Sequence, residues 1–169
     1  VNSAVSVGAT ITKRTVDVAA TTAPTKVYDG TTEAKGATFT LKTGVTGQGK
    51  VGTDDVSIVA SGGTFSTADA GTGKTYTVLS LDLAGADAGN YVLATGSFAG
   101  ATNGVVTPRP LTLSATRVYD GTNALTDVSL GNLVQGEYLT ISGLTADSPR
   151  AGTNRFVKTI TLSNVLDGS

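Results

Sequence analysis

A six-residue motif that occurs twice constrains the fold of this chain more than any other feature. The sequence Lys-Val-Tyr-Asp-Gly-Thr at residues 26–31 returns as Arg-Val-Tyr-Asp-Gly-Thr at residues 117–122, a spacing of 91 residues. Two further blocks repeat in the same order: residues 11–18 match residues 106–113, and residues 69–74 match residues 150–155. Three matched blocks indicate a tandem duplication. A period of about 90 residues is the size of a domain, too long for a solenoid turn or a propeller blade.

The duplication divides the chain into three parts. Residues 1–11 are expected to be the terminal strand of a preceding or neighbouring module. Residues 12–106 form a complete module, and residues 107–169 form a second module that lacks its last one or two strands. The joint between the modules contains Pro108 and Pro110. Because each proline fixes its own φ and biases the preceding residue toward an extended conformation, we expect a stiff joint and an extended rod of modules.

The residue types favour β-structure. Threonine and valine are abundant, there are 22 glycines, and charged residues make up only 15% of the chain. Thr and Val suit a pleated, half-buried surface, whereas Gly supplies turns with positive φ. Polar and apolar residues alternate at residues 38–41 and 76–79, as in half-buried strands. About seven such strands in a module predict an all-β fold of tandem Ig-like β-sandwiches.

The strands of the first module can be placed from these alternations and from the turn residues between them. We expect turns at Asp29-Gly30, residues 44–52, Gly62-Gly63, residues 70–73 and residues 85–89. The expected strands are residues 15–19, 25–28, 37–42, 55–60, 63–66, 74–81, 90–94 and 98–106.

Several function classes are disfavoured by what the chain lacks. It contains no Cys and no His, which removes the usual nucleophile–base pairs and the usual soft metal ligands. We therefore expect no enzyme activity. A net charge of −1 argues against nucleic acid as a partner, which requires a basic surface, and against electrostatic binding to membranes. No apolar stretch approaches the roughly 18 residues of a membrane span.

Three motifs together resemble a known family. They are Lys-Val-Tyr-Asp-Gly-Thr-Thr at residues 26–32, Gly-Ala-Asp-Ala-Gly-Asn-Tyr at residues 85–91 and Thr-Pro-Arg-Pro-Leu-Thr at residues 107–112. In this order they resemble the bacterial YDG/MBG-type Ig-like repeats, which occur in tandem in large secreted surface proteins similar to filamentous haemagglutinin. The second copy departs from the pattern because it has no counterpart of residues 85–91.

The resemblance implies a bacterial protein that is extracellular or located at the cell surface, with a role in a surface structure or fibre and without catalysis. It concerns a different family from the nucleic-acid-reading domain that shares the letters YDG.

The repeated Tyr-Asp-Gly motif is predicted to be structural. Tyr28 and Tyr119 would close the end of a module and form a hydrogen bond through the hydroxyl. Asp29 and Asp120 would accept hydrogen bonds from backbone N–H groups that follow them, while Gly30 and Gly121 would adopt positive φ. The alternative is a binding loop. Recurrence of the motif in both copies favours a requirement of folding.

Other residues leave weaker alternatives open. Ca²⁺ is the one cofactor that the sequence leaves open, through acidic side chains that are otherwise turn formers. These are Asp54, Asp55, Asp69, Asp82 and Asp87. No EF-hand spacing connects them, and nothing sets the separation that a glycosidase pair of carboxylates needs. Residues 44–50 resemble a phosphate loop but lack the Walker spacing, so we expect a long hairpin loop there.

Two functions fit these observations. One is an adhesin stalk segment, excerpted from a longer array in a bacterial surface or secreted fibre protein. The other is a processed mature subunit that assembles into a filament by β-strand donation. In it, residues 1–11 would enter the incomplete second module of a neighbour, with contacts from Val5, Val7 and Ile11. The chain begins with Val1, which fits either. The expected partners are copies of itself or adjacent modules, with a surface glycan or protein target left open. A carbohydrate-binding or glycan-active module is a remote alternative.

Overall fold

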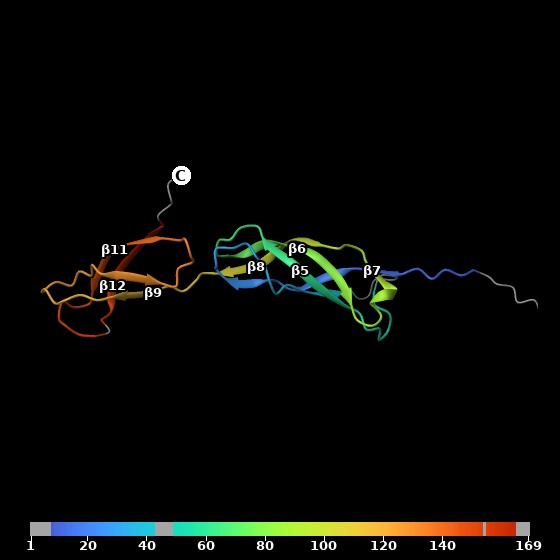
Figure 1. The fold of residues 1–169 in the computed structure, drawn as a ribbon, viewed down its shortest axis with the longest axis horizontal. Coiled ribbons are helices and arrows are strands. Elements are labelled where there is room, and N and C mark those ends of the chain that lie inside the picture. Colours follow the sequence, from blue (N-terminus) through green and yellow to red (C-terminus); the bar gives the residue numbers. More distant parts are fainter. Residues whose placement is uncertain (1–7, 43–48, 154, 165–169) are drawn as a thin grey trace, which may run out of the picture. The chain divides into compact units, whose positions relative to one another are not determined.

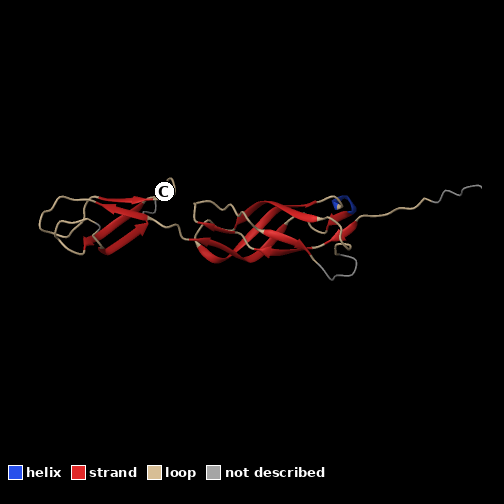
Figure 2. Ribbon diagram, turned by 90° about the horizontal axis from the view of Figure 1, so that it is seen from below, coloured by secondary structure: helices blue, strands red, loops and turns tan. Residues whose placement is uncertain are grey.

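The chain is all-β and divides into two compact units. The computed structural model describes residues 8–42, 49–153 and 155–164, in which one 3₁₀ turn, η1 (Ala88–Asn90), is the only regular element that is not a strand (Figures 1 and 2). The units are Val1–Pro108 and Arg109–Ser169. The predicted all-β class is therefore confirmed. No helix in the described ranges has the length and hydropathy needed to cross a membrane.

The larger sheet of the first unit contains four strands. Their order is β3 (Thr25–Val27), β8 (Phe98–Thr107), β6 (Gly71–Ala84) and β5 (Ser57–Phe65). Strand β6 lies antiparallel to both β5 and β8, and these long strands lie beside one another in Figure 1. The short strand β3 is parallel to β8. Strand β8 is therefore an inner strand of this sheet, held on both sides.

Four shorter strands form the other ladders of the first unit. Strand β1 (Arg14–Val16) pairs in parallel with β7 (Tyr91–Leu93). After the single residue Asp17, the chain continues as β2 (Val18–Thr22), which pairs antiparallel with β4 (Thr38–Leu41). Because β1 and β2 are almost continuous, one extended segment connects the two ladders.

Alternating apolar residues of these strands supply the core. In β4 the sequence Thr-Phe-Thr-Leu buries Phe39 and exposes its threonine neighbours, and in β6 Tyr76 and Val78 are buried on one face. The ring of Phe39 meets that of Phe98 edge-on, with centroids 5.1 Å apart. A second cluster contains Val16, Val56 and Tyr91. Period-two burial is what a sheet with one covered face requires.

The turn predicted at Gly62-Gly63 is wrong, because β5 runs through both residues. Ser61 pairs with Ser80 and Gly63 pairs with Val78, so the register is unchanged across Gly62, which lies beside Leu79. Gly62 has φ +66°, which is a conformation that glycine adopts without strain. Glycine therefore lets β5 continue through this position as one long strand, with no inserted residue.

The described part of the second unit contains two antiparallel pairs of strands. Strand β9 (Thr112–Ala115) pairs with β10 (Val128–Gly131), and β11 (Leu139–Ala146) pairs with β12 (Val157–Asn164). Leu144 is buried in this unit. The described part of β12 pairs with β11 alone, whereas β6 of the first unit is held on both sides.

Candidate functional site

The Asp-Gly turn of the first motif is built around one carboxylate oxygen. Asp29 Oδ1 accepts hydrogen bonds from the Thr31 backbone N–H at 2.9 Å and the Thr31 hydroxyl at 2.8 Å, and it lies 2.6 Å from Lys26 Nζ. Gly30 completes the turn with φ +76°. The Lys26 ammonium, followed by the Thr31 groups, lowers the pKa of Asp29 well below its ordinary value. The carboxylate of Asp29 therefore ties Lys26 and Thr31 together across the turn.

The second motif repeats this turn. Asp120 Oδ1 accepts hydrogen bonds from the Thr122 backbone N–H and hydroxyl, both at 2.9 Å, and forms an ion pair with the Arg117 guanidinium. Gly121 has φ +84°. Arginine thus takes the place of lysine with the same function. All these acceptor and donor groups are used within the turn, as in a structural element.

The tyrosines of the two motifs differ in their surroundings. Tyr28 packs against the main core cluster, and its backbone N–H donates to the Thr107 carbonyl at the end of β8, 2.8 Å away. Tyr119 is 64% exposed. Strand β8 supplies the neighbour of Tyr28, and the described part of the second unit has no strand in that place.

The five aspartates considered for Ca²⁺ do not all gather at one place. The Tyr91 hydroxyl donates to Asp54 at 2.5 Å, the Asp55 N–H donates to Asp87 at 2.8 Å, and the Ala86 N–H donates to Asp55 at 3.0 Å. The carboxylate of Asp54 raises the pKa of Tyr91. Among the described residues no three acidic side chains come together as a metal site would need. Ca²⁺ stays an open alternative to the expectation that these aspartates are turn formers.

Parallel pairing at both ends of one long segment is the feature of the first unit that sequence analysis did not anticipate. Arg14 lies opposite Tyr91 in the β1–β7 ladder, and Val27 lies opposite Thr107 in the β3–β8 ladder. Hydrogen bonds continue both ladders: Ala94 N–H to the Val16 carbonyl at 2.9 Å, and Val105 N–H to the Pro24 carbonyl at 3.0 Å. The two ends of the segment 14–28 are thereby held against the two ends of the segment 91–107, and both segments run in the same direction.

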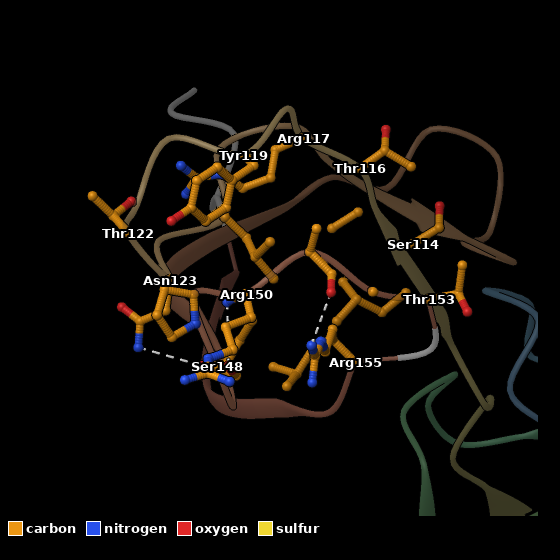
Figure 3. A pocket seen from close by; sticks show the side chains of 18 residues that line it. Ser114, Thr116, Arg117, Tyr119, Thr122, Asn123, Ser148, Arg150, Thr153 and Arg155 are labelled. Carbon is orange, nitrogen blue, oxygen red and sulfur yellow. Dashed lines mark hydrogen bonds between the residues drawn. The ribbon is translucent and has the colours of Figure 1, made fainter.

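A groove is the corresponding feature of the second unit. It has a volume of about 600 Å³ and lies between the segment that carries Arg117 and Tyr119 and the segment that carries Arg150 and Arg155 (Figure 3). Ala146 and Val157, which pair across the β11–β12 ladder, line it as well. Phe156, next to Val157, is 79% exposed. Apolar side chains and three arginines therefore share this groove.

Of the three residues predicted for strand donation, Ile11 alone lies among the described residues. Val5 and Val7 lie outside the described residues. Ile11 is 98% exposed and lies in no strand. Sequence analysis missed Arg150 and Arg155 as groove residues, although the matched blocks at residues 69–74 and 150–155 contain them. Comparing residues 150–155 with the matching block of the first copy, which a strand covers, would have indicated that these residues line a groove.

These observations define an all-β protein whose two units share the Asp-Gly turn and a common hairpin pattern. The sequence profile of the YDG domain matches residues 12–98, which is more than half of the chain. The chain therefore belongs to the YDG domain family. No curated protein and no solved structure matches it.

Proposed function

We propose that this chain is a stalk segment of a bacterial adhesin or of another surface or secreted fibre protein, and that its function is mechanical. The observation that carries this proposal is the parallel pairing of β1 with β7 and of β3 with β8, which joins the beginning of the first unit to its end. Membership of the YDG domain family and the resemblance to tandem Ig-like repeats of secreted proteins support it further.

The direction of the strands determines how the unit responds to tension. In a stalk, force enters the first unit before β1 and leaves it after β8, at Thr107. Because β3 and β8 are parallel, pulling the two ends apart slides one strand along the other and loads all bonds of the ladder together. In an antiparallel hairpin that is pulled from its open ends, the bonds break one after another.

Force spectroscopy on the whole chain tests the proposal, since the chain has no cysteine of its own to interfere. One variant, Thr12→Cys with Pro108→Cys, places the handles across the first unit. The control, Thr53→Cys with Ala86→Cys, places the handles just before β5 and just after β6, so that it pulls that antiparallel hairpin from its open ends and unzips it. We expect a clearly higher unfolding force for the first pair, because forced unfolding follows the barrier in the direction of pulling. Equal forces in the two directions would contradict a mechanical role.

A further inference from the structure

An aspartate followed by glycine is a reactive point in a polypeptide, and each unit has one in its turn, at Asp29-Gly30 and at Asp120-Gly121. The backbone nitrogen of the glycine can attack Cγ of the aspartic acid, because glycine has no side chain to obstruct the approach. A C–N bond forms, a C–O bond of the protonated carboxyl group breaks, and water leaves with the amide proton. The succinimide ring then takes up water and opens to aspartate or to isoaspartate.

Isoaspartate would disrupt the turn of the first unit. In isoaspartate the main chain runs through the side-chain Cβ, so the backbone is one atom longer and the remaining carboxylate is one atom shorter. Asp29 Oδ1 accepts from the Thr31 N–H at 2.9 Å, and the N–H of the preceding Tyr28 donates to the Thr107 carbonyl at 2.8 Å. Both hydrogen bonds depend on the ordinary length of the chain. The reactive pair therefore lies where its isomerisation would loosen the attachment to β8.

The residues around Asp29 hold its carboxylate away from this reaction. Closing the ring on the Gly30 nitrogen would turn Oδ1 out of its contacts with Lys26 Nζ, the Thr31 N–H and the Thr31 hydroxyl. Lys26 Nζ also donates to the carbonyl of Thr31 at 2.7 Å and to its hydroxyl at 2.9 Å, and the lysine side chain is only 16% exposed. The cation is thus fixed within the turn. It favours the ionised carboxylate, which cannot release water in the ring closure.

The second unit has the same arrangement with a different cation. Asp120 Oδ1 accepts both hydrogen bonds from Thr122 and pairs with the guanidinium of Arg117. Arg117 also donates to the Ala124 carbonyl, and its side chain is 17% exposed. Lysine and arginine differ in shape and in their other partners, yet each places a mostly buried cation on the same carboxylate oxygen. The two units therefore share a positive charge beside the Asp-Gly pair and not a particular side chain.

We propose that the cation three residues before the aspartate and the threonine two residues after it protect the Asp-Gly pair of each unit from isoaspartate formation. Aspartate and glycine are sufficient for a turn of this kind, so protection accounts for the cation that accompanies them in both units. The proposal goes beyond the mechanical function proposed above and does not depend on it.

Incubation of the purified full chain near neutral pH, at a temperature below its Tm, tests the protection. Isomerisation leaves the mass unchanged, so isoaspartate at Asp29 and Asp120 is measured by electron-transfer fragmentation of the digested chain. A synthetic peptide of residues 24–34 supplies the unprotected rate at Asp29, which should exceed the rate in the folded chain. Lys26→Met should raise the rate at Asp29 roughly three- to tenfold, as expected for loss of an exposed charge-assisted hydrogen bond, and leave Asp120 unchanged. Arg117→Met should do the reverse.

Exchanging the cations separates charge from side-chain shape. Lys26→Arg and Arg117→Lys give each unit the cation of the other and should retain the protection. Lys35→Met is the matched control, because this lysine pairs with Glu33 outside the turn, and it should leave both rates unchanged. Amide hydrogen exchange in β6 reports whether the first unit stays folded. If Lys26→Met unfolds it, Thr31→Val, which removes only the hydroxyl contact, should still raise the rate at Asp29.

Two outcomes would overturn the proposal. One is an unchanged rate at Asp29 in a folded chain that carries Lys26→Met or Thr31→Val. The other is equal acceleration by Lys26→Arg and Lys26→Met, since the positive charge would then not be the protecting feature. Neither outcome bears on the unfolding forces of the first unit, so failure here is distinguishable from failure of the proposed function.

Discussion

Tyr76 and Tyr91 are both buried in the first unit, and removing their hydroxyls should change its stability in opposite directions. Tyr76 lies in the main core cluster beside Phe98, with ring centroids 6.0 Å apart. Among the described residues its hydroxyl has no hydrogen-bond partner, and burial raises its pKa. The Tyr91 hydroxyl donates to Asp54 and accepts from the Val51 N–H at 3.0 Å.

The expected magnitude for Tyr76→Phe follows from the cost of burying an unpaired polar group. That cost is about 1–3 kcal/mol, and part of it is offset by the small space that the missing oxygen leaves. We expect Tyr76→Phe to stabilise the first unit by about 1 kcal/mol, which for a domain of this size raises Tm by roughly 4–8 °C. Tyr91→Phe should lower Tm, because it leaves the Val51 N–H and the Asp54 carboxylate without this partner.

Differential scanning calorimetry of the full-length variants measures both effects, and amide exchange in β6 assigns the transition to the first unit. The comparison is well matched, since each variant removes one tyrosine oxygen from the same unit. A lower Tm for Tyr76→Phe would show that its hydroxyl is hydrogen bonded in solution. An unchanged Tm for Tyr91→Phe would show that its two hydrogen bonds contribute nothing, and either result would refute this reasoning.

Two further predictions concern a glycine and the Asp-Gly turn. A Cβ at Gly63 would lie 2.0 Å from the Ala34 carbonyl oxygen, so Gly63→Ala should destabilise the first unit by about 2 kcal/mol or more in urea titrations, whereas Gly89→Ala, with open space around it, should have little effect. The folded-state pKa of Asp29 is depressed below its ordinary value of 3.8, so its contribution to stability is present above that pH and is lost as pH falls below it. Asp29→Asn should therefore lose less stability than wild type when urea titrations are repeated from pH 5 down to about pH 2, and parallel pH curves for the two proteins would contradict this assignment.

The strands of the first unit were largely predictable because their residues alternate and their turns contain glycine or aspartate. Residues 98–106 were expected as a strand and form β8, and residues 38–41 lie in one as expected. The glycine pair at residues 62 and 63 was misassigned as a turn, because glycine with positive φ is typical of turns, whereas β5 continues through both residues in register with β6. Local sequence gives the need for glycine, but pairing with β6 determines whether the chain turns there or continues as a strand.

The candidate site was predictable only in its local part. Asp29 and Asp120 bond to residues two positions further on, so the motif itself contains every group of the turn. The groove in the second unit depends on Arg117 and Arg155, which are far apart in sequence, and on Ala146 and Val157, which pair across the β11–β12 ladder. Such a juxtaposition follows from strand pairing and cannot be obtained from local patterns.

The sequence by itself determined the duplication, the all-β class and the Asp-Gly turns, because periodicity and turn chemistry depend on neighbours along the chain. The tertiary structure alone decided that β1 and β3 pair in parallel with β7 and β8, since parallel partners come from distant parts of the chain. It also decided that the edge of β12 faces a groove while the equivalent edge of β6 holds β8. The same hairpin has two surroundings because pairing across a sheet, and not residue type, determines which edge is covered.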